Sequence, residues 1–205
     1  MNLSGRKPQK GMKMTRILKR GNLYLIGMPG SGKSTIGRML ADALDGSFLD
    51  MDEYIVEIAG ETIPQLFARG EDCFRDWETC ACRQLSGRSA AGGDSARPSD
   101  LPEDGRVIAT GGGVVKRREN VELLKASGLL VFLNRPVEQI AGDETVDAQS
   151  RPLLARDKSR VYALFEERYP LYRDAADLSV VNCPRMEDTV AAILAGLEQL
   201  TGGRT

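Results

Sequence analysis

Gly27-Met-Pro-Gly-Ser-Gly-Lys-Ser-Thr35 is the stretch that decides the fold of this 205-residue chain. It matches the pattern Gly-x4-Gly-Lys-Ser/Thr and lies between a short apolar run, Leu23–Met28, and a helical period, Ser34–Leu44. A strand, a glycine-rich turn and a helix N-terminus in that order form a cradle of backbone N–H groups for phosphate. The sequence therefore predicts a site for a nucleoside triphosphate.

Each position of this loop has a chemical reason. Gly30 and Gly32 let the main chain curl so that successive N–H groups point at phosphate oxygens. Lys33 can bridge the β- and γ-phosphates, and the Ser34 hydroxyl is placed to bind Mg²⁺. A glycine-rich turn that only caps a helix is the alternative, but it leaves the cost of burying Lys33 unexplained. The residues expected to bind ATP are Gly30, Ser31, Gly32, Lys33, Ser34 and Thr35.

Outward from the loop, apolar runs alternate with helical periods. The predicted strands are Leu23–Met28, Ser47–Asp50, Arg106–Ala109, Leu129–Asn134 and Leu178–Val181. The predicted helices are Ser34–Leu44, Glu53–Ala59, Ile63–Ala68, Glu71–Leu85, Lys116–Ser127, Pro136–Ala141, Ser159–Tyr169 and Met186–Leu200. This order predicts a single α/β domain over residues 21–201, with three α/β/α layers around a central five-stranded parallel sheet.

One segment, residues 86–105, interrupts this pattern. Of its 20 residues, 16 are Gly, Ser, Ala, Pro or Asp, and Leu101 is its one larger aliphatic residue. Such a segment buries too little apolar surface to offset its ordering entropy. We expect a flexible surface loop there.

Two residue types limit the chemistry. Histidine is absent, which excludes Ser-His-Asp and Cys-His nucleophile systems, His-Glu-x-x-His zinc sites and imidazole proton shuttles. Catalysis must therefore use carboxylates, lysine, arginine, hydroxyls, thiols, backbone amides or a bound metal. The cysteines form neither a Cys-x-x-Cys pair nor a zinc spacing, which favours a reduced, cytoplasmic protein. They are Cys73, Cys80, Cys82 and Cys183.

Residues 1–20 form a basic leader. They hold seven basic residues and no acidic one, whereas the remainder carries 21 basic and 29 acidic residues. A nucleic-acid arm is one interpretation; we favour a disordered leader, or a start at Met12 or Met14. The leader lacks the apolar core of a secretory signal, and no stretch reaches the roughly 20 apolar residues of a membrane helix. We expect neither a nucleic-acid nor a membrane partner.

Two carboxylates, Asp50 and Asp52, stand at the end of the second predicted strand. Ligands of parallel sheets bind in the crevice at the carboxyl ends of the strands, so both acids are expected near the phosphate loop. A helix N-cap followed by a first-turn charge is the alternative interpretation.

Two further patterns indicate an acceptor site. Arg75 and Glu78 lie three residues apart on one predicted helix, where the carboxylate can hold the guanidinium in place. A solvated surface ion pair is the usual alternative. Thr110-Gly-Gly-Gly113 follows a predicted strand, and three costly glycines indicate that a group approaches the main chain closely, with a flexible turn as the alternative.

Together these residues resemble the shikimate kinase family of P-loop small-molecule kinases, from about Leu23 to about Leu200. The motifs are the phosphate loop, Leu49-Asp-Met-Asp52, Gly70-Glu71 with Phe74-Arg75 and Glu78, Thr110-Gly-Gly-Gly113, Arg151-Pro-Leu-Leu154, and Arg168 before Pro170-Leu171-Tyr172. The resemblance implies a nucleoside-monophosphate-kinase-like fold and transfer of the γ-phosphoryl of ATP to the 3-hydroxyl of shikimate, on the route to chorismate and the aromatic amino acids. It also implies a cytoplasmic monomer.

The resemblance assigns roles as well. It places Mg²⁺ with Ser34 and Asp50, and it makes Asp52 the candidate base that holds the acceptor hydroxyl. It implies that Arg75 and Arg168 clamp the substrate carboxylate while a backbone glycine donates to a ring hydroxyl. The implied catalytic residues are Lys33, Asp52 and Arg151, and the implied substrate-binding residues are Asp52, Arg75, Gly111, Gly112, Gly113 and Arg168.

A lid is expected over about residues 142–158, and Arg151 matches the family's lid arginine that closes over the phosphates. Closure would exclude water, which otherwise competes as acceptor. Many family members carry an arginine some seven residues before the lid motif, where it stacks on adenine, but Glu144 stands here. Adenine recognition then falls to Arg135, Arg156 or the loop Asn182–Met186.

Two other functions fit parts of the sequence. A gluconate or nucleoside monophosphate kinase would use the same strand, loop and helix, but those acceptors do not call for Arg75, Gly112 and Arg168 in these settings. A nucleotide-dependent regulatory or nucleic-acid-binding protein would use the basic leader. The acidic body and the lack of an aromatic stacking platform argue against it.

Overall fold

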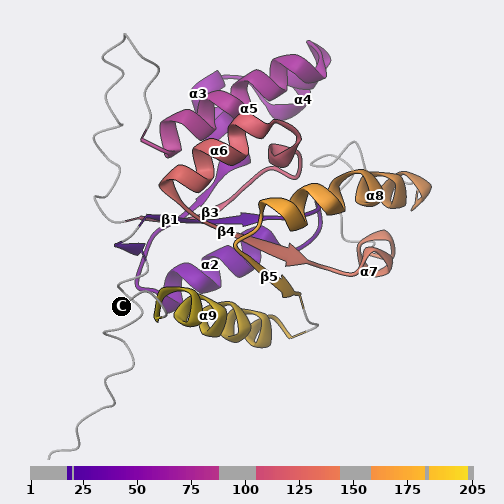
Figure 1. Cartoon of the computed structure of the whole chain (residues 1–205). Coiled ribbons are helices and arrows are strands. Elements are labelled where there is room, and N and C mark those ends of the chain that lie inside the picture. Colours follow the sequence, from indigo (N-terminus) through magenta and orange to yellow (C-terminus); the bar gives the residue numbers. More distant parts are fainter. Residues whose placement is uncertain (1–17, 20, 88–104, 144–157, 183–184, 203–205) are drawn as a thin grey trace, which may run out of the picture.

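The computed structural model describes residues 18–19, 21–87, 105–143, 158–182 and 185–202 (Figure 1). Most of the predicted leader, of the predicted loop 86–105 and of the predicted lid lies outside these ranges. Arg151, Glu144 and Arg156 lie outside them too. Among the described residues, no helix is both long and apolar enough to span a bilayer.

Five parallel strands form the central sheet, as the sequence predicted. They are β1 Asn22–Ile26, β2 Phe48–Asp50, β3 Val107–Ala109, β4 Gly128–Asn134 and β5 Leu178–Val181. Their order in the sheet is β2-β3-β1-β4-β5, and every neighbouring pair is parallel. Strand β1, which feeds the phosphate loop, therefore lies at the centre, where both of its neighbours fix its position.

Helices cover both faces of this sheet (Figure 1). Helices α2 and α9 lie on one face, and α5, α6 and α8 lie on the other, with α3 and α4 beside α5. The bounds are α2 Lys33–Ala43, α3 Met51–Ala59, α4 Ile63–Ala68, α5 Glu71–Leu85, the short 3₁₀ helix η1 Val114–Lys116, α6 Arg118–Ser127, α7 Val137–Ala141, α8 Lys158–Ala175 and α9 Met186–Gly202. The predicted three-layer α/β/α architecture is confirmed.

Strand β1 shows how the sheet separates two hydrophobic cores. Successive side chains of a strand point to opposite faces. Leu23 and Leu25 pack into the core under α2 and α9, whereas Tyr24 and Ile26 pack into the core under α5, α6 and α8. A strand buried on both faces reads as the continuous apolar run seen in the sequence.

Helix α8 is longer than predicted. The prediction ended at Tyr169 because the next residue is proline, but the helix continues through Pro170 to Ala175. Tyr172 and Ala175 beyond the proline are buried, and the Tyr172 ring stacks on Phe132 with centroids 5.2 Å apart. Burial of this last turn outweighs the hydrogen bond that proline cannot make.

The end of the predicted leader takes part in the fold. Leu18 is buried in the core under α2 and α9. Its carbonyl oxygen accepts hydrogen bonds from the N–H groups of Gly21 at 3.2 Å and Gly105 at 2.8 Å. The apolar side chain of Leu18 therefore packs with the domain, although two basic residues, Lys19 and Arg20, follow it.

All five strands point in one direction, so their carboxyl ends meet at one edge of the sheet. Strand β1 runs into the phosphate loop there, β2 ends at Asp50, and β3 is followed by Thr110. Ligands of open parallel sheets bind at this edge.

Candidate active site

The phosphate loop bends around the start of α2 in a shape that requires glycine. Gly30 has φ 83° and Gly32 has φ 89°, in the left-handed region that other L residues rarely adopt. Gly32 is the N-cap of α2, and the first N–H groups of a helix lack intrahelical partners. The backbone therefore has the form that phosphate binding at this helix N-terminus requires.

Lys33 lies at the start of α2 with its ammonium group folded back over the loop. Its Nζ donates hydrogen bonds to the carbonyl oxygens of Gly27 and Met28, each at 2.9 Å. These acceptors offset part of the cost of burying a cation whose residue is only 8 % exposed. An arriving phosphate would meet an ammonium group that is already held inside the loop.

Ser34, Asp50 and Asp52 lie next to the loop. Ser34 Oγ donates to Asp50 Oδ2 at 2.6 Å, and the Asp52 N–H donates to Asp50 Oδ1 at 3.0 Å. The N-cap alternative is thus right for Asp50, which caps α3, but the same carboxylate also reaches Ser34. Thr35 is exposed one position further along α2.

The close approach predicted at the three glycines is made by the protein's own groups. A Cβ atom at Gly111 would lie 2.9 Å from Glu78 Oε1 and 3.0 Å from Asp52 Oδ1. A Cβ atom on the middle glycine would lie 2.6 Å from a proline carbon of the phosphate loop, and one on Gly113 would collide with the Arg75 guanidinium. The bare backbone lets carboxylates, phosphate loop and guanidinium converge at one place.

Arg75 and Glu78 form a buried ion pair, so the solvated alternative was wrong. Arg75 Nη1 donates to Glu78 Oε2 at 2.8 Å, and the two side chains are 6 % and 0 % exposed. Burial raises the pKa of Glu78, an effect that the adjacent Arg75 partly offsets. Its other oxygen, Oε1, is buried without a hydrogen-bond partner among the described residues and faces Gly111.

Arg168 and Tyr172 reach the glycines from α8. Arg168 Nη1 donates to the carbonyl oxygen of Gly112 at 3.1 Å, and the Tyr172 hydroxyl donates to the same oxygen. Both residues are buried, and Arg168 Nε has no hydrogen-bond partner among the described residues. Burial raises the pKa of Tyr172, which keeps its hydroxyl a neutral donor.

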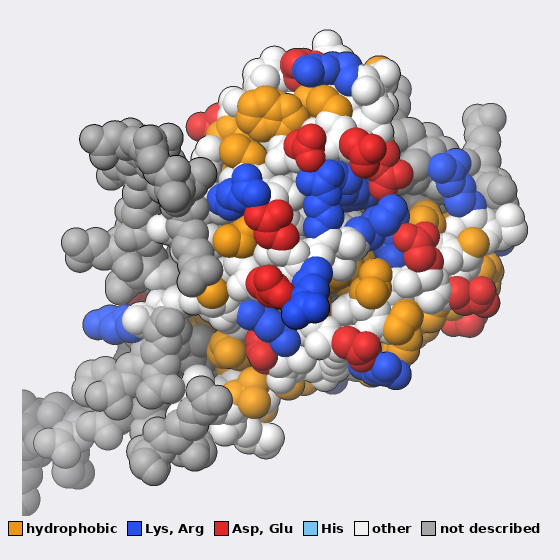
Figure 2. Space-filling view, turned by 45° about the horizontal axis from the view of Figure 1, so that its top comes forward, with side chains coloured by type: hydrophobic (Ala, Val, Ile, Leu, Met, Phe, Trp, Pro, Cys, Tyr) orange, Lys and Arg blue, Asp and Glu red, His pale blue; other side chains and the backbone are white. Residues whose placement is uncertain are grey.

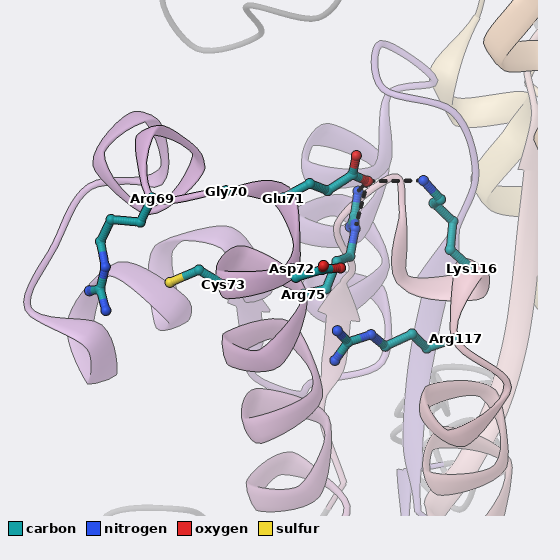
Figure 3. Close-up of a pocket in the computed structure, with 8 residues that line it drawn as sticks. All are labelled: Arg69, Gly70, Glu71, Asp72, Cys73, Arg75, Lys116 and Arg117. Atoms are coloured by element: carbon teal, nitrogen blue, oxygen red, sulfur yellow. Dashed lines mark hydrogen bonds and ion pairs between the residues drawn. The ribbon is translucent and has the colours of Figure 1, made fainter.

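A cavity of about 540 Å³ opens beside Arg75 (Figure 3). On its wall Glu71 Oε1 accepts from Arg75 Nε and Nη2, each at 3.2 Å, and from Lys116 Nζ at 2.9 Å. The hydrogen bond from Lys116 is the largest cause that lowers the pKa of Glu71. The lining residues are Arg69, Gly70, Glu71, Asp72, Cys73, Arg75, Lys116 and Arg117.

The charges on the side of the molecule that carries α3–α6 are mixed in sign. Figure 2 shows basic side chains gathered near the middle of this face with acidic side chains among them. Arg69 pairs with Glu61 and Arg117 pairs with Asp76, each at 2.7 Å. Such pairing suits a site for a small anion better than a surface that tracks a nucleic-acid backbone.

Comparison with known proteins gives the decisive observation. The family described as "Shikimate kinase" matches residues 29–198. The chain belongs to the shikimate kinase family. The matched range holds most of the phosphate loop, both carboxylates after β2, the three glycines and both buried arginines.

Curated relatives and solved structures of the family cover most of the chain. The shikimate kinase of Clostridium beijerinckii is 43 % identical over 80 % of this chain and 86 % of its own. That of Pseudomonas entomophila is 42 % identical over 87 % and 97 %. The structure of shikimate kinase from Acinetobacter baumannii in complex with shikimate has a TM-score of 0.75 and 31 % identity, covering 93 % of this chain and 98 % of that one.

The gluconokinase from Sinorhizobium meliloti shares the fold alone. Its structure has a TM-score of 0.53 and 17 % identity, covering 90 % of this chain and 95 % of that one. The shikimate kinase from Aquifex aeolicus, at a TM-score of 0.71 and 35 % identity over 88 % and 98 %, is much more similar. The P-loop kinase fold is therefore common to both, and the family likeness is specific.

The structure brings the predicted residues of the family together, with one exception. The predicted nucleotide and acceptor residues all lie at the carboxyl edge of the sheet or on the loops and helices that follow it. Arg151 lies outside the described residues. Two further residues, Tyr172 and Lys116, contact this site, and the sequence predicted no role for either. Arg135, which the sequence offered only as a candidate for adenine, contacts it too. Tyr172 belongs to the motif around Arg168, but no local pattern predicts that its hydroxyl bonds a glycine 60 residues away.

Proposed function

We propose that the chain transfers the γ-phosphoryl group of ATP to the 3-hydroxyl of shikimate, giving shikimate 3-phosphate and ADP. The observation that carries this proposal is the pair of buried arginines, Arg75 and Arg168, at the three glycines beside the phosphate loop. Guanidinium groups bind a carboxylate in a fork, and shikimate carries one carboxylate and three hydroxyls. The site therefore offers an anion clamp next to a phosphate cradle.

The nucleotide half consists of the loop and the start of α2. Backbone N–H groups of Gly30, Ser31 and Gly32 and of the first turn of α2 would bind the phosphates, with Ser34 and Thr35 beside them. Lys33 would leave the loop carbonyls for the β- and γ-phosphates and move with the transferring group. Its present hydrogen bonds keep the ammonium close to that position.

Ser34 and Asp50 fit a magnesium ion. Mg²⁺ takes few protein oxygens and keeps several waters and substrate phosphates. A hydroxyl 2.6 Å from a carboxylate oxygen supplies that kind of donor pair, and the described residues hold no larger cluster of acidic, cysteine or histidine side chains for a metal. Bound there, Mg²⁺ would neutralise charge on the phosphates. Asp50 would act largely through water, as its capping role on α3 keeps its carboxylate in place.

Asp52 is the proposed base. It is one of the two carboxylates that converge on Gly111, and the other, Glu78, is engaged by Arg75. Asp52 would accept a hydrogen bond from the 3-hydroxyl and take its single proton as the new O–P bond forms. Phosphoryl transfer otherwise needs positioning and charge neutralisation, which a chain without histidine can supply.

Besides Asp52, two arginines and three glycines would hold the acceptor. Arg75 and Arg168 would bind its carboxylate, and the backbone of Gly111, Gly112 and Gly113 would meet its ring. The carbonyl of Gly112 is already occupied by Arg168 and Tyr172, so the main chain of the glycines is fixed before the substrate arrives. Ordering the site beforehand reduces the entropy cost of binding.

The remaining parts of the proposal follow from the family. Arg151 on the segment 142–158 would close over the transferring phosphoryl group and help exclude water. An arginine supplied in this way is worth on the order of 10³–10⁵ in rate in other phosphoryl-transfer enzymes. A cytoplasmic location and a monomeric state complete the proposal. It also includes a single kinase domain that takes in Leu18, with the basic leader before Leu18 dispensable.

A coupled assay of ADP release tests this function. Shikimate, gluconate and a nucleoside monophosphate are supplied in turn, and release is expected with shikimate alone. Asp52→Asn should lower kcat about 10²- to 10⁴-fold, the range for a general base, with little change in the KM for ATP. Glu53→Gln is the matched control, because it removes an exposed carboxylate one residue away on α3. Turnover of another acceptor without shikimate, or an active Asp52→Asn enzyme, would overturn the proposal.

A further inference from the structure

Two side chains from outside the loop motif hold consecutive carbonyl groups of the phosphate loop. Arg135, just after β4, donates from Nη1 to the carbonyl oxygen of Gly30 at 2.8 Å. Asn182, just after β5, donates from Nδ2 to the carbonyl oxygen of Ser31 at 2.8 Å. The loop is therefore fixed from the far half of the sheet as well as by its own glycines.

The bond from Asn182 determines where the next N–H group points. A trans peptide carries its C=O and N–H on opposite sides, and the described residues contain no cis peptide bond. Because the carbonyl of Ser31 turns toward Asn182, the N–H of Gly32 turns the opposite way, away from Asn182. Gly32 also lacks room for a side chain, since a Cβ atom there would lie 2.8 Å from Asn182 Nδ2.

Asn182 is itself held in one orientation. Its backbone N–H donates to the carbonyl oxygen of Asn134 at 3.0 Å. Its Oδ1 accepts a hydrogen bond from Thr189 Oγ1 of α9 at 3.0 Å, and both side chains are buried. A flipped amide would set Oδ1 against the carbonyl of Ser31, which can only accept, so this carbonyl selects the orientation in which the amide donates. The hydroxyl of Thr189 holds the amide in that orientation by donating to Oδ1.

We propose that Asn182, held in place by Thr189, is a positioning residue for the nucleotide. It presets the phosphate loop so that the N–H of Gly32 faces the phosphates before ATP arrives. This inference deepens the proposed function and rests on it, because it takes the loop to be the ATP site. It assigns Asn182 a role in nucleotide affinity and none in binding the acceptor, whose residues lie on other elements.

The test measures ADP binding by calorimetry, together with the separate KM values for ATP and shikimate. Asn182→Ala removes the donor, and Thr189→Val removes only the hydroxyl that holds Oδ1 of Asn182. Each should weaken ADP binding and raise the KM for ATP about 2- to 12-fold, the range for one hydrogen bond, with the KM for shikimate unchanged within twofold. Thr189→Ser keeps the hydroxyl and should restore wild-type ADP affinity.

Thr201→Val is the matched control. Thr201 lies on the same helix, and its hydroxyl donates to the carbonyl oxygen of Leu197 at 2.8 Å, so the variant loses a threonine hydroxyl away from the loop. It should lower the melting temperature without changing ADP affinity. If Asn182→Ala does not fold, the pair Thr189→Val and Thr189→Ser still decides the question.

Three outcomes overturn the proposal. One is a lower melting temperature in Asn182→Ala or Thr189→Val with unchanged ADP affinity, which would make the contact merely structural. Another is an equal loss of affinity for ADP and for shikimate. The third is a Thr189→Ser variant that behaves like Thr189→Val. ADP binding is measured without an acceptor, so the first and third outcomes stand apart from whether shikimate is the substrate.

Discussion

The nucleotide half and the acceptor half of this site are built in opposite ways. The nucleotide half is one continuous stretch, residues 27–35, whose shape comes from glycines with positive φ at the start of a helix. The acceptor half collects side chains from α3, α5, α8 and the turn after β3. Its shape comes from buried charges, above all the pair of Arg75 and Glu78.

Because the two halves are built differently, substitutions in them should affect activity and stability differently. In the nucleotide half, the ammonium group of Lys33 donates to two backbone carbonyl oxygens of the loop. In the acceptor half, Arg75 and Glu78 form a buried pair, so removal of either one leaves an uncompensated ion. Removal of Lys33 should therefore lower the rate, and removal of Arg75 should lower both function and stability.

Lys33→Met is expected to have the largest effect on activity. The substitution keeps the length of the side chain but removes the charge that would neutralise the transferring phosphoryl group, so kcat should fall at least about 10³-fold. Steady-state kinetics measure the loss, and the melting temperature and the affinity for shikimate should change little. Lys125→Met, at an exposed position of α6, is the control. A drop in kcat below about tenfold would contradict the role of Lys33.

Arg75→Met should cause the largest loss of stability. It leaves the Glu78 carboxylate buried at 0 % exposure, and breaking such a pair costs about 3–5 kcal/mol of unfolding free energy. Urea denaturation measures the loss, and affinity for shikimate should fall with it. Arg118→Met, which breaks an exposed pair with Glu122, should leave stability almost unchanged.

The pH dependence of this variant sharpens the comparison. Burial raises the pKa of Glu78, so its contribution to stability is present at pH below its unfolded pKa and is lost as pH rises through its folded pKa. Without Arg75 the carboxylate has lost its counterion, and Arg75→Met should be less stable at pH 8 than at pH 5. Adding Glu78→Gln should remove this pH dependence and recover stability without recovering shikimate binding. Recovery of binding as well would show that Arg75 acts only through the fold.

How much the sequence could predict follows the same division. The sheet, the loop and Lys33 were predictable because a strand, a glycine pattern and a helix start carry local signals. The spacing of Arg75 and Glu78 also predicted their pairing, but their burial depends on packing by the rest of the chain. Extension of α8 beyond Pro170 was missed for the same reason, because the burial of Tyr172 is a tertiary effect.

Contacts between distant residues were the part that sequence patterns could not supply. Asn182 and Thr189 lie seven residues apart in the chain, yet their joint role appears only when the amide meets Ser31, 151 residues away. Arg135 was one of several candidates for adenine, and the structure shows contacts that the sequence did not predict, to Gly30 and to Asp143, each at 2.8 Å. A polar residue at a strand end has many possible partners, and only the fold selects one.

Tyr172→Phe should have the smallest effect and tests whether the acceptor half depends on its neutral groups as well. The variant keeps the ring on Phe132 and leaves Arg168 as the remaining donor to the carbonyl of Gly112. Loss of one hydrogen bond should raise the KM for shikimate about 2- to 12-fold with kcat nearly unchanged. Because burial raises the pKa of Tyr172, its hydroxyl stays protonated, and the ratio of the variant's KM for shikimate to that of the wild type should be constant from pH 6 to pH 9.

Tyr24→Phe is the control. It removes a buried hydroxyl that bonds Ser127 at 2.8 Å and should lower stability without changing the KM for shikimate. An equal rise in KM in both variants would mean that core packing, rather than the fixed carbonyl of Gly112, sets the affinity for shikimate.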